Sequence, residues 1–83
     1  MKLIKVFATW CGPCKALDKL LRENNIKYES VDIDSLDGEG ISMKYNVSEL
    51  PTLLLLDDNE NLIRKNIGVP TLQELMKFIY ETN

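Results

Sequence analysis

The sequence contains no histidine among its 83 residues, and this absence removes several kinds of catalytic site. Ser-His-Asp triads, Cys-His nucleophile pairs and histidine-ligated metal sites all need an imidazole. The chain has 10 basic against 13 acidic residues and no basic cluster, which makes nucleic acid a poor candidate partner. The longest apolar run is residues 53–56, whereas a membrane-spanning helix needs about 20 apolar residues. We therefore expect neither a nucleic-acid-binding protein nor a membrane-spanning one.

The composition predicts one small globular domain over residues 1–83. Hydrophobic residues make up 45% of the chain and charged residues 28%, which is too apolar for a disordered protein. Lys5 interrupts the first apolar residues before the core of a secretory signal can develop. We therefore expect a cytoplasmic location. Thiols are kept reduced there, so the two cysteines are expected to be catalytic or metal-binding.

Hydrophobic periodicity predicts seven elements in the order β-α-β-α-β-β-α. A strand-helix-strand unit closes with parallel strands, and a hairpin through residues 57–61 adds an antiparallel pair. The fold class is therefore α/β, a mixed four-stranded sheet flanked by three helices. The expected strands cover residues 3–8, 28–33, 52–56 and 62–67.

The three expected helices differ in how clearly the sequence marks them. The first begins at Pro13 and ends at residues 24–25. Residues 34–40 are polar and predict a turn, followed by a short second helix around Ile41 and Tyr45. The third begins at a capping box, the pair Thr71 and Glu74. Its apolar residues are expected in the core: Leu72, Leu75, Met76 and Ile79.

Cys11 and Cys14 stand at the predicted junction between the first strand and the first helix. Their spacing places both sulfurs on one side of the first helical turn. The N–H groups and dipole of a helix N-terminus favour an anion, and the thiolate is the form of cysteine that attacks disulfides. The dipole contributes only about 0.3–1 kcal/mol, so hydrogen bonds to the Cys11 sulfur must supply further stabilisation. The pattern favours a redox-active pair.

Two other interpretations of the cysteine pair stay open. A metal or iron–sulfur carrier would have to bridge two chains through Cys11 of each subunit, because one chain supplies only half of a zinc site. A purely structural disulfide would close a very short loop, which constrains the unfolded chain little. Three aspartates lack the spacing of a calcium loop and are expected to be solvated loop carboxylates: Asp32, Asp34 and Asp37.

Three features of the sequence together resemble the thioredoxin family. Residues 10–15, WCGPCK, look like its active-site motif, and Leu-Pro-Thr at 50–52 resembles its cis-proline loop. Gly68 matches its late glycine, and the three features occur in the family's order. The resemblance implies a minimal thioredoxin fold, close in size to glutaredoxins, with no counterpart of the leading strand and helix of full-length thioredoxins.

The resemblance implies a role for each matched residue. Cys11 would be the nucleophile that forms a mixed disulfide with a substrate, and Cys14 would resolve it. The Leu50–Pro51 peptide bond would be cis, with Pro51 beside the two sulfurs and the Leu50 backbone paired with an extended substrate segment. A shallow apolar docking surface would be completed by Trp10, Gly12, Pro13 and Gly68.

Three of these residues also have plainer interpretations. Trp10 could merely cover the first helix, and Pro51 could be an ordinary turn proline. Gly68 could do no more than break the strand before Pro70.

Lys5 departs from the family pattern, in which a buried aspartate stands at this position of the first strand. Because the chain also lacks histidine, the usual base for deprotonating the resolving cysteine is absent. Lys5 could support a thiolate through its charge, or act as the base with a lowered pKa if it is buried. The simpler interpretation is that its stem packs along the sheet while its ammonium reaches water.

The residues and the resemblance together predict a monomeric protein-disulfide reductase that needs no bound cofactor. Its substrates would be disulfide-containing proteins, with a reductive enzyme such as ribonucleotide reductase suggested by family analogy. The implied electron donor is an NADPH-dependent thioredoxin reductase, with the glutathione system as second choice. Gly12-Pro13 stands where glutaredoxins typically carry Pro-Tyr, so strong glutathione use is not expected. A glutathione-linked, glutaredoxin-like protein is the alternative within the same class.

Overall fold

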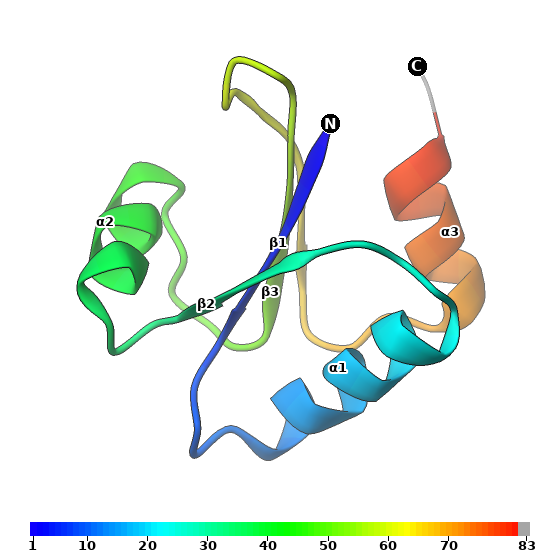
Figure 1. The fold of residues 1–83 in the computed structure, drawn as a ribbon, viewed down its shortest axis with the longest axis horizontal. Coiled ribbons are helices and arrows are strands. Elements are labelled where there is room, and N and C mark those ends of the chain that lie inside the picture. The colour runs from blue at the N-terminus through cyan, green and yellow to red at the C-terminus, as the bar shows by residue number, and fades with distance from the viewer. Residues whose placement is uncertain (82–83) are drawn as a thin grey trace.

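A computed structural model describes residues 1–81, and its seven elements confirm the predicted order (Figure 1). The prediction of one domain over residues 1–83 extends to two residues outside the described part and stays a prediction. Among residues 1–81, no helix combines the length and apolarity needed to cross a bilayer. The strands are β1 (Lys2–Phe7), β2 (Glu29–Asp32), β3 (Thr52–Leu56) and β4 (Leu62–Ile67). The helices are α1 (Gly12–Glu23), α2 (Leu36–Lys44) and α3 (Leu72–Tyr80).

The four strands form one mixed sheet in the order β2-β1-β3-β4. β1 pairs in parallel with β2 and antiparallel with β3, and β4 is antiparallel to β3. The ends of β1, β2 and β4 therefore meet the start of β3 at a single edge of the sheet. This edge receives the segments that follow three of the strands and the segment that precedes the fourth.

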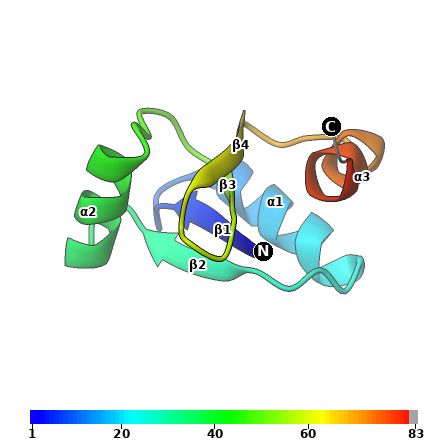
Figure 2. The same cartoon turned by 90° about the horizontal axis from the view of Figure 1, so that it is seen from above.

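The helices cover the sheet from both sides, with α2 on one face and α1 and α3 on the other (Figure 2). Because successive strand residues point to opposite faces, the central strands divide their side chains between two cores. Leu3, Leu53 and Leu55 pack with residues of α1 and α3, whereas Ile4 and Leu54 belong to the cluster that Tyr45 covers. All five residues of β3 are buried, as expected for a strand covered on both faces.

The second helix begins earlier than the sequence analysis placed it. The prediction of a turn through residues 34–40 was wrong from Leu36 onward, because α2 begins there. Ser35 is its N-cap and accepts a hydrogen bond from the Gly38 N–H, with an Oγ···N distance of 3.0 Å. The signals of a helix start were present, but the small and polar residues that follow concealed them.

The core face of α3 is also shifted relative to the prediction. The capping box of Thr71 and Glu74 is confirmed, and Leu75 is fully buried. Leu72 was expected in the core, yet it is 45% exposed. Phe78 packs against the core together with Ile79. Leu72 lies in the first turn, beyond the end of the apolar contact with the sheet.

Candidate functional site

The site is built at the sheet edge where the segments following β1, β2 and β4 meet the start of β3. Cys11 follows β1 and is the N-cap of α1, with its backbone N–H donating to the Ala8 carbonyl at 3.1 Å. Cys14 lies in the first turn of the same helix. The two side chains form a disulfide, and their Cα atoms are 5.4 Å apart. The predicted proximity of the two sulfurs is confirmed.

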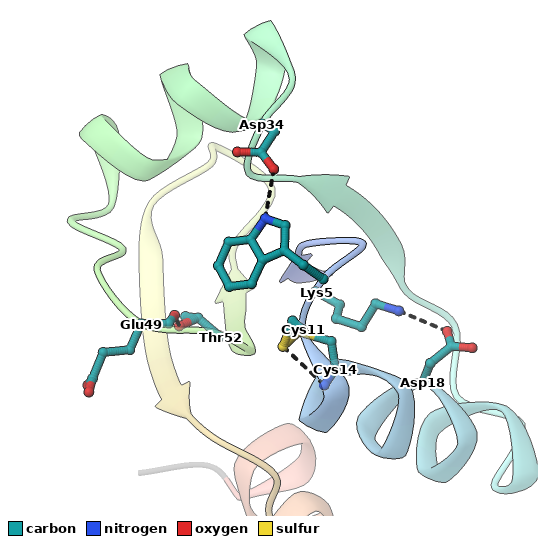
Figure 3. Close-up of a disulfide and its surroundings, with 8 residues drawn as sticks. Lys5, Cys11, Cys14, Asp18, Asp34, Glu49 and Thr52 are labelled. Carbon is teal, nitrogen blue, oxygen red and sulfur yellow. Dashed lines mark hydrogen bonds and ion pairs between the residues drawn. A yellow bond between two sulfur atoms is a disulfide. The ribbon is translucent and has the colours of Figure 1, made fainter.

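The N-terminus of α1 supplies the hydrogen bond that the Cys11 sulfur was expected to need. The Cys14 backbone N–H donates to Cys11 Sγ at 3.2 Å (Figure 3). Pro13 occupies the first turn, where a missing N–H costs no helical hydrogen bond. When the disulfide is reduced, an anion on Cys11 Sγ has a backbone donor and the positive end of the helix dipole beside it.

The loop before β3 confirms the predicted cis peptide bond between Leu50 and Pro51. Thr52 Oγ1 donates to the Glu49 carbonyl at 2.6 Å and closes the loop onto the buried start of the strand (Figure 3). The Gly68 N–H donates to the Pro51 carbonyl at 2.8 Å, and Gly68 has a φ of +88°. This left-handed conformation favours glycine and lets the chain leave β4 directly beside the cis-proline loop.

A cavity of about 490 Å³ lies on the Cys11 side of the disulfide and is called the groove below. It is lined by four of the residues expected at the docking surface, Trp10, Gly12, Pro13 and Leu50. Pro51 and Gly68 are not among its lining residues. The groove also contains four residues that the sequence analysis did not assign to the site: Ile33, Asp34, Val47 and Ser48.

Asp34 holds the exposed tryptophan of the groove in place. Trp10 is 71% exposed, and its indole Nε1–H donates to Asp34 Oδ2 at 3.1 Å. The prediction that Asp34 is only a solvated loop carboxylate was therefore incomplete. Topology offered a signal for this contact, because Trp10 follows β1 and Asp34 follows β2, and the ends of parallel strands lie at one edge.

The Lys5 side chain is buried and paired rather than extended into bulk solvent, so the simpler of its interpretations was wrong. Its side chain is only 6% exposed, and its Nζ lies 2.9 Å from Asp18 Oδ1 (Figure 3). The same ammonium lies 5.0 Å from the centroid of the Phe7 ring and 5.4 Å from that of the Tyr28 ring. Lys5 thus lies on β1 as a buried cation paired with a carboxylate of α1.

Asp18 accepts hydrogen bonds from two other segments of the chain and forms an ion pair within its own helix. Besides Lys5, the Tyr28 hydroxyl donates to Oδ1, and Arg22 Nε lies 3.2 Å from Oδ2. The hydrogen bond from Tyr28, followed by that from Lys5, holds the pKa of Asp18 below its usual value. Burial, reinforced by the hydrogen bond to Asp18, raises the pKa of Tyr28 to about 12. This cluster was not predicted from the sequence, where its one signal is a charged residue on the Cys14 face of α1.

A second cavity of about 540 Å³ lies on the Cys14 side of the disulfide. It is called the cationic cavity below, because three of its lining side chains are cations and one is a carboxylate. The lining residues are Lys5, Phe7, Ala8, Thr9, Cys14, Lys15, Asp18 and Arg22.

The described residues offer no cluster of metal ligands. Within residues 1–81, no three Cys, Asp or Glu side chains gather closely enough to hold a metal ion. The aspartates at and just beyond the end of β2 take part in local hydrogen bonds, since Asp32 Oδ1 accepts one from the Asp34 N–H at 2.9 Å. The chemistry that the site supports is exchange at the two sulfurs.

Comparison with known proteins places this site in a recognised context. The family model described as Thioredoxin matches residues 1–81. A thioredoxin of Staphylococcus epidermidis is 39% identical over 83 residues, covering 95% of this chain and 79% of the relative. Thioredoxin-2 of Pyricularia oryzae is 38% identical over 81 residues, covering 89% of this chain. The chain spans about half of that relative's length, 46%.

Two solved structures resemble the fold closely. The reduced thioredoxin pre-protein of Schistosoma mansoni has a TM-score of 0.74 and 32% identity, covering 93% of this chain and 77% of that one. Oxidised mitochondrial thioredoxin 3 of Saccharomyces cerevisiae has a TM-score of 0.74 and 32% identity, covering 96% of this chain and 76% of that one.

Proposed function

The chain belongs to the thioredoxin family of thiol-disulfide oxidoreductases, and from this premise we propose that it reduces disulfide bonds in other proteins through Cys11 and Cys14. The observation that carries the proposal is the disulfide across the N-terminus of α1, with a backbone donor on the Cys11 sulfur. This geometry lets a pair of electrons enter or leave as one S–S bond breaks or forms, with no bound cofactor.

The reaction proceeds by two exchanges. In the reduced protein, the Cys11 thiolate attacks one sulfur of a substrate disulfide, which breaks that bond and releases one substrate thiolate. The Cys14 thiolate then attacks Cys11 Sγ, so that the internal disulfide forms and the mixed disulfide breaks. The second substrate thiolate leaves, and both substrate thiolates take up protons from solvent, which has received the protons lost by the two cysteines. Two electrons and two protons have moved from the dithiol to the substrate.

The groove is the proposed docking surface for the substrate. Trp10, Gly12, Pro13 and Leu50 surround Cys11 in it, and the Asp34 carboxylate fixes the orientation of the exposed indole. The Leu50 backbone pairs with an extended segment of the substrate. Pro51 and Gly68 hold this part of the chain through their mutual hydrogen bond rather than by lining the groove. Lys5 supports the active site from the other side of the disulfide.

The partners follow from the same family membership. Disulfide-containing proteins are the substrates, and an NADPH-dependent thioredoxin reductase is the electron donor that we propose first, with the glutathione system second. We further propose that the protein acts as a monomer in the cytoplasm, where the reducing conditions suit a dithiol. One structural neighbour is mitochondrial, so a second compartment is known among similar proteins.

Trapping of a substrate tests this function. We expect Cys14→Ser to accumulate a mixed disulfide between Cys11 and a disulfide-containing protein such as insulin, because no second thiol is present to release it. The matched control, Cys11→Ser, should trap nothing. Non-reducing electrophoresis and mass spectrometry of the linked peptides measure both. Equal trapping by the two variants, or trapping by neither, would contradict the assignment.

A further inference from the structure

The two sulfurs of the active site face different environments. Cys11 lines the groove, whose other members are largely apolar, whereas Cys14 lines the cationic cavity. Cys14 and Asp18 are one turn apart on α1 and therefore share a face of the helix. Lys5 extends from β1 toward this face, and its ammonium meets Asp18 next to the first turn (Figure 3).

The charges of the cationic cavity do not cancel. Lys5 from β1 and Lys15 and Arg22 from α1 contribute three cations, against the single carboxylate of Asp18. That carboxylate accepts hydrogen bonds from Lys5 and from the Tyr28 hydroxyl, and it forms an ion pair with Arg22. Its negative charge is therefore compensated from several directions, and the cations that line the cavity with Cys14 outnumber its one carboxylate.

Of the three cations that line the cavity, Lys5 is the buried one, and its charge is therefore the least screened by water. An ammonium has three N–H donors, and its hydrogen bond to Asp18 uses one of them. With a side-chain exposure of 6%, Lys5 is screened by water far less than Lys15, which is exposed on the cavity rim. The cavity volume of about 540 Å³ is large enough for several waters that can receive a proton.

Resting on the proposed function, we propose that Lys5 is a positioning residue for Cys14, whose ionisation in the mixed disulfide is favoured by the Lys5 charge and needs no carboxylate base. The Cys14 S–H bond breaks and its proton passes to water in the cationic cavity. The electron pair left on Cys14 Sγ forms the bond to Cys11 Sγ, and the bond from Cys11 to the substrate sulfur breaks. Asp18 orients Lys5 and does not accept the proton, since a carboxylate with two hydrogen-bond donors and an ion pair binds a proton weakly.

The pKa of Cys14, measured in a Cys11→Ser background, tests the proposal directly. Thiolate absorbance in the far ultraviolet, followed against pH, reports on the one remaining thiol. We expect Lys5→Met to raise the Cys14 pKa by about 1, because it removes an opposite charge from a poorly screened site. Lys15→Met is the matched control, with the same charge change at an exposed position of the same cavity, and should leave the Cys14 pKa within about 0.3 of the parent value.

A double variant separates the effect of losing the Lys5 charge from the effect of leaving the Asp18 carboxylate without its partner. Lys5→Met alone exposes Cys14 to Asp18, so Lys5→Met/Asp18→Asn is measured as well, and it also keeps the test available if the single variant does not fold. We expect the double variant to raise the Cys14 pKa too, and Lys5→Arg to restore it. A parent-like pKa in the double variant, or an equal rise in Lys15→Met, would overturn the proposal.

The resolving step provides a second readout in the chain with both cysteines. In single-turnover reduction of a protein disulfide at neutral pH, Lys5→Met should slow release of the second substrate thiol about tenfold for each unit by which the Cys14 pKa rises. Formation of the mixed disulfide by Cys11 should keep its rate. If Cys14→Ser traps substrate but the Cys14 pKa is the same with and without the Lys5 charge, the proposed function stands and this inference fails.

Discussion

The hydroxyl of Tyr28 connects the active-site charges to the stability of the fold. It donates to Asp18, which also receives Lys5 from β1 and Arg22 from α1, so one carboxylate joins three segments of the chain. Burial and this hydrogen bond raise the Tyr28 pKa to about 12, from an ordinary value of 10.0. Because the folded pKa is raised, the folded state holds the phenol proton more strongly than the unfolded chain does. The resulting stability is present below pH 10 and lost as the pH rises toward 12.

Tyr28→Phe should therefore destabilise the protein in a pH-dependent way. We expect the free energy of unfolding at pH 7 to fall by about 1–2 kcal/mol, since a hydrogen bond to a charged group is lost. The difference from the parent should shrink as the pH rises from about 10 to 12, where the parent loses the contribution as well. Urea unfolding across this range measures it, and Tyr80→Phe, at a tyrosine 67% exposed, is the control. A difference that stays constant up to pH 12 would contradict this role of Tyr28.

For single residues, the sequence predicted the chemistry of the two sulfurs better than it predicted the partners of the buried charged residues. Cys11, Cys14 and Pro51 could be assigned because a short motif and its place in the chain specify them. Lys5 could not be assigned a partner, because Asp18 lies 13 residues away and only the packing of α1 on β1 brings the two together.

Among the elements, α2 is the one whose position depends on a close backbone approach. Gly38 is buried, and a Cβ at this position would lie 1.9 Å from the Asp32 carbonyl oxygen of β2. Gly40, two residues further along the same helix and so on a different side of it, faces open space. The short helix can therefore lie directly against the end of β2, next to the segment that carries Ile33 and Asp34 into the groove.

Substituting alanine for Gly38 and for Gly40 should change the free energy of unfolding in opposite directions. Gly38→Ala must displace backbone, which we expect to lower the free energy of unfolding by about 1–3 kcal/mol. The shift should also weaken substrate reduction, because the contact between Trp10 and Asp34 depends on the end of β2. Gly40→Ala should raise the free energy of unfolding by about 0.5–1 kcal/mol through helix propensity. Chemical unfolding of both variants measures these changes. Equal changes in the free energy of unfolding would show that the packing of α2 against β2 does not require glycine at position 38.

The elements that the sequence predicted best are those with a strong local signal. β3 and β4 match their predicted bounds, since an apolar run and an Asp-Asn-rich hairpin loop mark them. The start of α2 was missed because the residues that follow Leu36 are polar or small. Leu72 was misplaced because apolar spacing alone does not say where the contact with the sheet ends.

For the whole molecule, the sheet order brings distant segments to the active-site edge. Cys11, Asp34, Leu50 and Gly68 each follow or precede a different strand, and the mixed pairing places these strand ends together. The order of elements was predictable from periodicity. The cavities on the two sides of the disulfide were not, because they depend on how α1 and α2 pack on opposite faces of the sheet.

The reduction potential of the Cys11–Cys14 disulfide is the measurement that tests the central claim most directly. Equilibration of the whole protein with glutathione redox buffers, followed by thiol alkylation and mass spectrometry, gives the fraction oxidised. A protein that reduces substrates in a cell should have a potential near that of thioredoxins, about −270 mV. A value near −120 mV, typical of a protein that donates disulfides, would contradict the account.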